Sequence, residues 1–443
     1  MATTYLSRTP ASTTNQQIFT FSTWFKFSDV SATYNNIASF GASSVTDGVC
    51  YIDINSSKQL EIFMRASGTE YKSITTQLFR DTNAFYHIVV AVDTTQATST
   101  NRTKVYVNGS QVSAFSTQNA VPQSTNLLVN TSGSENRIGA SRDSGGTIGN
   151  YLNGSLAHTH FIDGTQYQAS DFGETDATTG IWKPKTAPSV TYGTNGFFLK
   201  FENSGAFGTD SSGNANNFTV NGTMTQTIDT PSNVFATLNP LSIKSTMTLS
   251  EGNLTVANTA SQGLSISTIA VTQGKWYFET KQTIASSSGY SVMIGVAKVD
   301  NIDVTNYFGQ NANSWGYASD NNKFHNGTST SYGNASNSVG EIYMCALDLD
   351  NGKIFFGLNG TWFDSGDPAS GTNPAYSNVS GTIGFGSRPY DNTASINFGN
   401  GYFGTTAVSS AQNPDDGIGI FEYDVPTGYR ALCTKSINAE EYD

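Results

Sequence analysis

The sequence of 443 residues is poor in charge, because Asp, Glu, Lys and Arg together make up only 13% of it. Lys and Arg number 22 against 34 Asp and Glu, so the formal net charge is −12 at pH 7. Affinity for nucleic acids depends largely on cationic side chains that displace counterions from phosphates. The acidic balance, without any run of Lys or Arg, therefore predicts no nucleic-acid partner.

Cysteine is equally scarce, and the three cysteines, Cys50, Cys345 and Cys433, are far apart. At least one of them cannot pair within the chain, so the sequence predicts no disulfide framework, and no C-x-x-C spacing suggests a metal site. No apolar run approaches the roughly 18 residues that span a membrane, and residues 1–10 lack the pattern of a secretory signal. We therefore expect synthesis in a cytoplasm and no membrane insertion.

Aromatic residues and glycine, by contrast, are abundant: 27 Phe, 21 Tyr, 5 Trp and 43 Gly. This composition favours short strands joined by tight turns over helices. From Ile18 to Phe27 (IFTFSTWFKF) apolar and polar residues largely alternate, as in a half-buried strand, and similar segments recur along the chain. Asn108-Gly109 and Asn153-Gly154 are typical of hairpin turns. The sequence predicts an all-β fold.

The alternating segments form two series, which predicts two tandem antiparallel β-sandwiches (jelly rolls). We expect the first over residues 1–202 and the second over residues 250–405. Residues 203–249 lack a periodic apolar pattern and contain Pro231 and Pro240, so we interpret them as a linker. We expect residues 406–443 to form a C-terminal extension of the second sandwich.

The first series resembles a concanavalin-like, laminin-G-type jelly roll. The resemblance rests on FTFSTWFKF at Phe19–Phe27, FYHIVVAVDTT at Phe85–Thr95 and KVYVNGSQV at Lys104–Val112. It implies a sandwich of about 200 residues in which calcium, where present, is held by loops at the rim. On that implication, the weak calcium candidates are Asp93 and Asp143, which lie in Asp-containing loops.

The second series resembles a SPRY domain, another sandwich that serves in binding. The resemblance rests on GKWYFE at Gly274–Glu279, MIGVAK at Met293–Lys298 and VGEIYMCALDLDNGKIFFGLNGTWF at Val339–Phe363. Glu341 stands where the family more often has Asp, and Tyr343 where it more often has Gly. These departures leave the fold intact and put a family-typical peptide pocket in doubt.

The pairing of the two modules resembles structural proteins of tailed bacteriophages of the marine type. Three further segments resemble these proteins: TYGTNGFFLKF at Thr191–Phe201, DSSGNANNFTV at Asp210–Val220 and the C-terminal IFEYDVPTGYRALCTKSINAEEYD. The resemblance implies a non-enzymatic virion protein, a tail or head fibre or adhesin that binds host-surface glycan or protein, and a homo-oligomer such as a trimer. The alternative is a capsid or neck decoration protein that binds other virion subunits. A polysaccharide depolymerase is a distant alternative.

For recognition we expect an aromatic platform beside amide and carboxylate groups. The loops of the second series supply these types in the following candidate ligand-binding residues: Tyr290, Trp315, Tyr317, Asp320, Asn321, Asn322 and Tyr390. Core packing is the competing interpretation, above all for Trp315. We expect the other tryptophans, Trp24, Trp182, Trp276 and Trp362, to pack rather than to bind.

Catalytic residues are not indicated. A glycoside hydrolase needs two carboxylates that straddle the scissile bond, whereas Glu279 and Glu341 are isolated on separate strands and fit surface positions. His158 and His160, two apart in a strand, would share a face and could chelate a metal, but no third ligand is in sight, and a hydrogen-bonded pair is the competing interpretation. We expect His87 to be a packed histidine.

Overall fold

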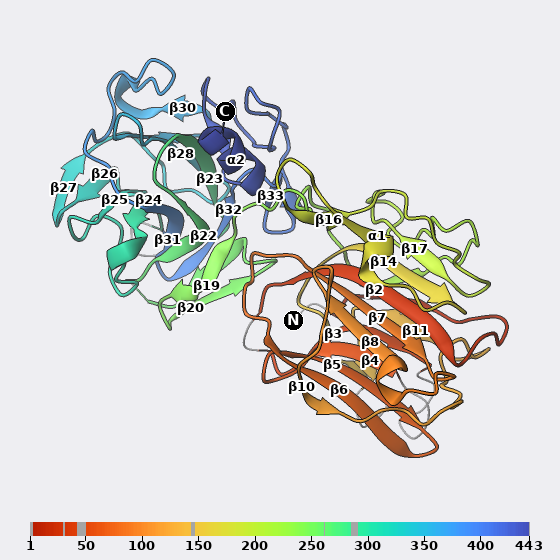
Figure 1. The fold of residues 1–443 in the computed structure, drawn as a ribbon. Coiled ribbons are helices and arrows are strands. Elements are labelled where there is room, and N and C mark those ends of the chain that lie inside the picture. The colour runs from red at the N-terminus through yellow and green to blue at the C-terminus, as the bar shows by residue number, and fades with distance from the viewer. Residues whose placement is uncertain are drawn as a thin grey trace. The chain divides into compact units, whose positions relative to one another are not determined.

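The computed structural model of the protein describes residues 3–29, 32–41, 50–142, 147–260, 262–284 and 291–442. The chain divides into two compact units, unit 1 (residues 1–226 and 230–232) and unit 2 (residues 227–229 and 233–443). Each unit is built almost wholly from antiparallel strands in stacked sheets (Figure 1). The prediction of an all-β fold with two β-sandwiches is confirmed.

Unit 1 has two main sheets. The eight-stranded sheet contains, in spatial order, β10 (Phe115–Gln118), β6 (Thr69–Leu78), β5 (Gln59–Ala66), β4 (Cys50–Ile54), β3 (Asn35–Phe40), β11 (Asn136–Ile138), β1 (Tyr5–Arg8) and β18 (Thr219–Asn221). The six-stranded sheet contains β17 (Phe197–Leu199), β14 (Gly154–Asp163), β2 (Ile18–Phe27), β7 (Tyr86–Asp93), β8 (Thr103–Val107) and β9 (Ser110–Gln111). Two small sheets pair β12 (Ser141–Arg142) with β13 (Ile148–Gly149) and β15 (Gly173–Thr175) with β16 (Trp182–Pro184).

Strand β2 shows how the alternating pattern builds unit 1. Phe19, Phe21 and Phe25 are 0% exposed and lie in the core between the two sheets. Trp24 points to the other face of its sheet, where it is also buried, in a second apolar cluster with Phe172 of α1 (Ala169–Phe172). Both faces of this sheet are therefore covered, which explains why the strand is aromatic almost throughout.

Unit 2 also has two main sheets. The seven-stranded sheet contains β19 (Leu238–Ile243), β22 (Ser265–Val271), β31 (Ile383–Pro389), β24 (Val292–Lys298), β25 (Ser314–Ala318), β26 (Asn322–His325) and β27 (Thr328–Ser331). The second sheet contains β20 (Met247–Ser250), β21 (Thr255–Asn258), β32 (Asn392–Asn397), β23 (Lys275–Gln282), β28 (Ile342–Asp348), β29 (Lys353–Leu358) and β30 (Thr361–Trp362), and β35 (Arg430–Ala431) pairs with β23. A hairpin of β33 (Tyr402–Phe403) and β34 (Thr406–Ala407) and a helix, α2 (Thr434–Tyr442), complete the unit, and short 3-10 turns occur in the chain at Ser99–Asn101, Val299–Asn301 and Phe363–Ser365.

The structure places most of the expected linker, residues 203–249, inside the two units. Phe207 and Phe218 pack in the core of unit 1, where β18 adds to a sheet edge. Phe235 and Leu238 are buried in unit 2. Phe207, Phe218 and Phe235 lie outside the named strands, so no periodic pattern marks them, and Leu238 begins β19. The division between the units falls near residues 227–232.

The expected C-terminal extension, residues 406–443, belongs to unit 2. Strand β35 runs parallel to β23, and Phe421 and Tyr429 bury their rings in a cluster with Tyr277 of β23. The segment therefore covers the outer face of the second sheet.

The four tryptophans expected to pack are buried or half-buried. Trp24 and Trp276 are each 1% exposed, and Trp182 and Trp362 are half-buried. All three cysteines are buried and free. No helix in the described part of the chain is long and apolar enough to cross a membrane.

Candidate binding surface

The loops expected to bind a ligand meet at one end of the unit 2 sandwich. The backbone N–H of Ser319 donates to the carbonyl of Val292 at 3.0 Å, and that of Tyr390 donates to the carbonyl of Ser291 at 2.7 Å. The Ser319 hydroxyl accepts a hydrogen bond from the N–H of Ser291 at 2.7 Å. The register of β24 with β25 and β31 thus brings together the β25–β26 turn, the β31–β32 turn and the start of β24. Tyr290 itself lies outside the described residues.

Two of the expected binding residues, Trp315 and Tyr317, lie in the core instead. Each is 1% exposed. The indole of Trp315 stacks on His325 with ring centroids 4.8 Å apart and donates its N–H to Oδ1 of Asn378 at 3.0 Å. Both side chains point inward from β25, because alternate residues of a strand share a face. Neither ring is available as an aromatic platform, which corrects their place among the candidate binding residues and agrees with the competing interpretation of Trp315 as a core residue.

Tyr317 supports the neighbouring turn from below. Its hydroxyl donates to Oδ1 of Asn321 at 3.3 Å, and the same oxygen accepts the backbone N–H of Ala335. Asn321 has a φ of 66°, a left-handed conformation that asparagine tolerates. Asp320 and Asn322 flank it, both half-buried, and the N–H of Asn322 donates to Oδ1 of Asp320 at 3.2 Å. The turn is therefore held in one shape.

Two exposed aliphatic side chains lie at the same end of the sandwich. Ile284 is 53% exposed and Val339 is 58% exposed. Ile284 follows the end of β23, and Val339 precedes β28, which pairs with β23. Asn392, at the start of β32, donates from its side chain to the carbonyl of Ile284 at 3.0 Å. Sequence reasoning missed both residues, because a single aliphatic residue in a polar loop carries no periodic signal.

Tyr390 lies in the turn that joins the two sheets at this end, between β31 and β32. Its side chain is half-buried, with the guanidinium carbon of Arg388 5.2 Å from the ring centroid. The next residue, Asp391, is exposed. We call the group Ile284, Asp320, Asn322, Val339 and Tyr390 the loop-end surface.

Glu341 fixes the loop that carries Val339. It is 6% exposed, and its carboxylate accepts hydrogen bonds from the backbone N–H of Ser336 at 3.1 Å and of Ser338 at 2.9 Å. The hydroxyl of Tyr343 donates to the same carboxylate at 2.9 Å. The two family departures in the sequence, Glu341 and Tyr343, therefore act as a pair that preorganises the loop.

Glu279 is buried as well, on the outer face of the second sheet, and is 0% exposed. Its carboxylate accepts the backbone N–H groups of Glu422 at 3.0 Å and Tyr423 at 2.9 Å, and the hydroxyl of Tyr277 at 2.9 Å. Burial raises the pKa of Glu279 to about 7, against the opposing effect of these hydrogen bonds. The expected surface position of Glu279 and Glu341 is corrected: both carboxylates are buried and accept hydrogen bonds from within unit 2.

His87 is a packed histidine, as expected, with 1% of its surface exposed. The indole N–H of Trp182 donates to Nδ1 of His87 at 2.9 Å, and Nε2 lies 2.9 Å from the hydroxyl of Ser22. Because Nδ1 accepts, the proton of the neutral ring is on Nε2. The ring therefore cannot take a proton from Ser22 at that nitrogen, and burial lowers the pKa of His87 well below its ordinary value.

His158 and His160 do not present a chelating pair on one regular strand face. A bulge interrupts β14 between Ala157 and His160, and His158 adopts a φ of 48°. His160 is 0% exposed, stacks on Phe198 with centroids 3.9 Å apart, and places Nδ1 3.0 Å from the hydroxyl of Tyr192. Within the described ranges, no three His, Cys, Asp or Glu side chains group as metal ligands.

Asp93, one of the two calcium candidates, is occupied by its own turn. Its carboxylate accepts the N–H and hydroxyl of Thr95 at 3.0 and 2.6 Å and the side-chain amide of Gln96 at 2.6 Å. These hydrogen bonds outweigh the effect of burial and lower the pKa of Asp93. The other candidate, Asp143, lies outside the described residues.

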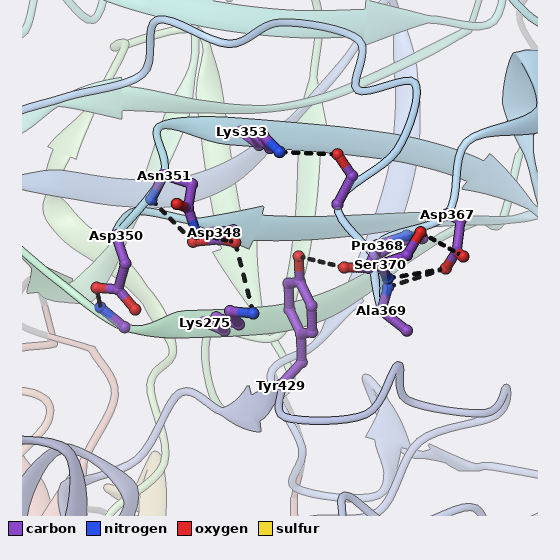
Figure 2. A network of polar contacts seen from close by, with 12 residues as sticks. Lys275, Asp348, Asp350, Asn351, Lys353, Asp367, Pro368, Ala369, Ser370 and Tyr429 are labelled. Atoms are coloured by element: carbon purple, nitrogen blue, oxygen red, sulfur yellow. Dashed lines mark hydrogen bonds and ion pairs between the residues drawn. The ribbon is translucent and has the colours of Figure 1, made fainter.

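The opposite end of unit 2 holds a polar network that serves the fold (Figure 2). Asp348, at the end of β28, accepts the backbone N–H of Asn351 at 3.0 Å and lies 3.6 Å from Nζ of Lys275. The Tyr429 hydroxyl, from the C-terminal segment, donates to the carbonyl of Pro368 at 3.4 Å. The polar groups of the turn at residues 347–353 (LDLDNGK) and of the neighbouring C-terminal segment therefore form contacts within the fold.

Comparison with known proteins identifies both sandwiches. Residues 2–169 match the laminin-G-type model described as the concanavalin A-like lectin/glucanases superfamily, and residues 275–400 match the SPRY domain model. The order of the two domains indicated by the sequence motifs is confirmed. No curated protein matches the chain.

Solved structures match part of the chain at low identity. The SPRY domain of human HERC1 is 17% identical with a TM-score of 0.29, and the match covers 36% of this chain and 96% of that one. The stonustoxin structure is 20% identical with a TM-score of 0.29, covering 37% and 26%. The TRIM65 PSpry domain is 17% identical with a TM-score of 0.28, covering 36% and 89%.

Proposed function

We propose that this chain, in which a concanavalin-like domain precedes a SPRY domain, is a binding protein that recognises a protein partner through the loop-end surface of unit 2. The observation that carries the proposal is the exposure of Ile284 and Val339, 53% and 58%, where the loops of both sheets converge. We take these two side chains, in loops next to the paired strands β23 and β28, as the apolar centre of an interaction site rimmed by polar residues. Both matched domain kinds serve mainly as binding modules, although the superfamily description of the first includes glucanases.

The side chains at this end favour a protein over a glycan. A sugar ring packs its apolar face on a flat aromatic side chain, and Trp315 and Tyr317 are buried. The described residues that are accessible here include the two aliphatic side chains, the exposed Asp391, and the half-buried Asp320, Asn322 and Tyr390. These fit a partner with apolar side chains surrounded by basic groups.

The wider role follows from the sequence resemblance. We place the protein in a phage virion, as a tail or head fibre or adhesin whose partner is a host-surface protein. The runner-up is a capsid or neck decoration protein, whose partner is another virion subunit. A depolymerase gains no support from Glu279 and Glu341, because the fold uses both carboxylates.

The test of this role uses the purified full-length chain. Light scattering measures its mass in solution, and pull-downs with intact candidate host cells and with purified phage particles measure its binding. A stable homo-oligomer that binds cells supports the adhesin, and one that binds only particles supports decoration. A chain that binds neither contradicts the proposed function.

A further inference from the structure

Three polar side chains lie in a row on the eight-stranded sheet of unit 1, one from each of three adjacent strands. The antiparallel register places Asn36 of β3 opposite Asp53 of β4, and Asp53 opposite Glu61 of β5. Residues directly opposite each other in such a ladder project from the same face, with Cβ atoms about 5 Å apart. The three side chains are therefore immediate neighbours.

This row lies on the face away from the sandwich core. Ile52 and Ile54, on either side of Asp53, are both core residues of unit 1. Successive side chains of a strand point to opposite faces, so Asp53 points outward. The same holds for Glu61, whose neighbours Leu60 and Ile62 are also core residues.

The row is nevertheless buried and poorly hydrogen-bonded. Asn36 is 0% exposed, Asp53 3% and Glu61 8%. Neither side-chain polar atom of Asn36, nor Oδ1 of Asp53, has a hydrogen-bond partner among the described residues. Buried polar groups are nearly always satisfied, so the unpartnered amide and carboxylate, side by side, point to a ligand between them.

The charges in the row are not balanced. Nζ of Lys72 lies 3.9 Å from Oε1 of Glu61, but it also lies 3.4 Å from Oε2 of Glu70. Among the described residues Asp53 forms no ion pair, and the register places the carboxylate of Glu61 directly beside it. A bound cation would relieve the repulsion between the two carboxylates.

We propose that Asn36, Asp53 and Glu61 bind a divalent cation of the hard, oxygen-preferring class, with Ca²⁺ as the best fit. The donors are two carboxylates and an amide carbonyl, all oxygen atoms. Ca²⁺ accepts irregular coordination completed by water, which suits a flat row on a sheet better than the strict octahedron of Mg²⁺. This site differs from the loop around Asp93, whose carboxylate is already satisfied.

The test compares the melting temperature of the full chain after chelation with that after addition of millimolar CaCl₂ or MgCl₂. Binding to the folded state alone raises the melting temperature with ligand concentration, so we expect a saturable rise with CaCl₂ in the wild type and a smaller one with MgCl₂. In Asp53→Asn the rise should disappear. The chelated variant should be at least as stable as the chelated wild type, because the substitution removes the repulsion with Glu61.

Two further variants make the outcome decisive. Glu61→Gln should also abolish the rise, which covers the case in which Asp53→Asn folds poorly. Glu202→Gln, an exposed carboxylate of unit 1 that lies outside the row, should retain the full rise. A wild type that does not respond to either salt, as expected if only water fills the site, overturns the proposal. So does a rise that persists in both Asp53→Asn and Glu61→Gln, since the ion would then bind elsewhere.

Discussion

The carboxylate of Glu279, in the middle of β23, accepts a hydrogen bond from the backbone N–H of Tyr423 at 2.9 Å, across 144 residues of sequence. Together with the bond from Glu422, it fastens the C-terminal segment to the outer face of the second sheet. The C-terminal part of the chain is thus a structural component of unit 2, with a buried acid as its attachment point.

Replacing Glu279 with Ala should destabilise unit 2 by about 3 kcal/mol, because it leaves two backbone N–H groups of the C-terminal segment and the buried Tyr277 hydroxyl without their acceptor. Urea unfolding measures the change. Glu441→Ala, an exposed carboxylate of α2, is the control and should change the free energy of unfolding by less than about 0.5 kcal/mol. An equal, small effect of both variants would show that Glu279 does not anchor the segment.

Glu279 should also make unit 2 less stable as the pH rises. Its pKa is about 7 in the folded chain and ordinary, 4.5, when unfolded, so the folded state binds the proton more tightly between these values. The free energy of unfolding contributed by this group is therefore full below about pH 4.5 and falls by roughly 2.5 kcal/mol from about pH 5 to about pH 8.

Chemical unfolding of the wild type and of Glu279→Gln over that pH range isolates this contribution. Burial lowers the pKa values of His87 and His160 in unit 1, so acid weakens that unit and acts in the opposite direction. The substitution leaves both histidines in place, and the difference between the two profiles reports Glu279 alone. Parallel profiles would contradict the raised pKa.

Tyr317→Ala should lower the free energy of unfolding of unit 2 by roughly 3 to 5 kcal/mol, because it leaves a cavity where the buried ring packs. Tyr317→Phe, which removes only the hydroxyl bonded to Asn321, should cost about 1 kcal/mol. Thermal and urea unfolding measure the stability of both variants and distinguish the loss of the ring from the loss of the hydroxyl. An alanine variant that keeps the stability of the wild type would mean that the ring is a surface residue, as the sequence suggested.

The strands were the most predictable part of the fold. The alternating segment Ile18–Phe27 is β2 to the residue. In such a segment the local sequence predicts the strand, because apolar residues at every second position share one face of a sheet and are buried together. The positions of the candidate loops at one sandwich end follow from the same strand registers.

What could not be predicted depends on contacts between distant residues. Glu279 reads as an isolated acid because its partners, Glu422 and Tyr423, come more than 140 positions later. Tyr317 and Ile284 also differ from what their residue types suggest for a binding loop. The aromatic ring expected to contact a ligand is buried, and the aliphatic side chain is exposed. Which face of a strand is covered, and by what, is a property of the assembled fold and not of the local pattern.

The most direct test of the central claim is binding by the double variant Ile284→Ser/Val339→Ser of the full chain. Both side chains are exposed, so the melting temperature should remain that of the wild type while binding to host cells or phage particles, whichever the wild type binds, falls at least tenfold. Leu78→Ser, an exposed aliphatic residue of unit 1 (42%), is the matched control and should bind normally. Wild-type binding by the double variant would contradict the assignment of the loop-end surface as the recognition site.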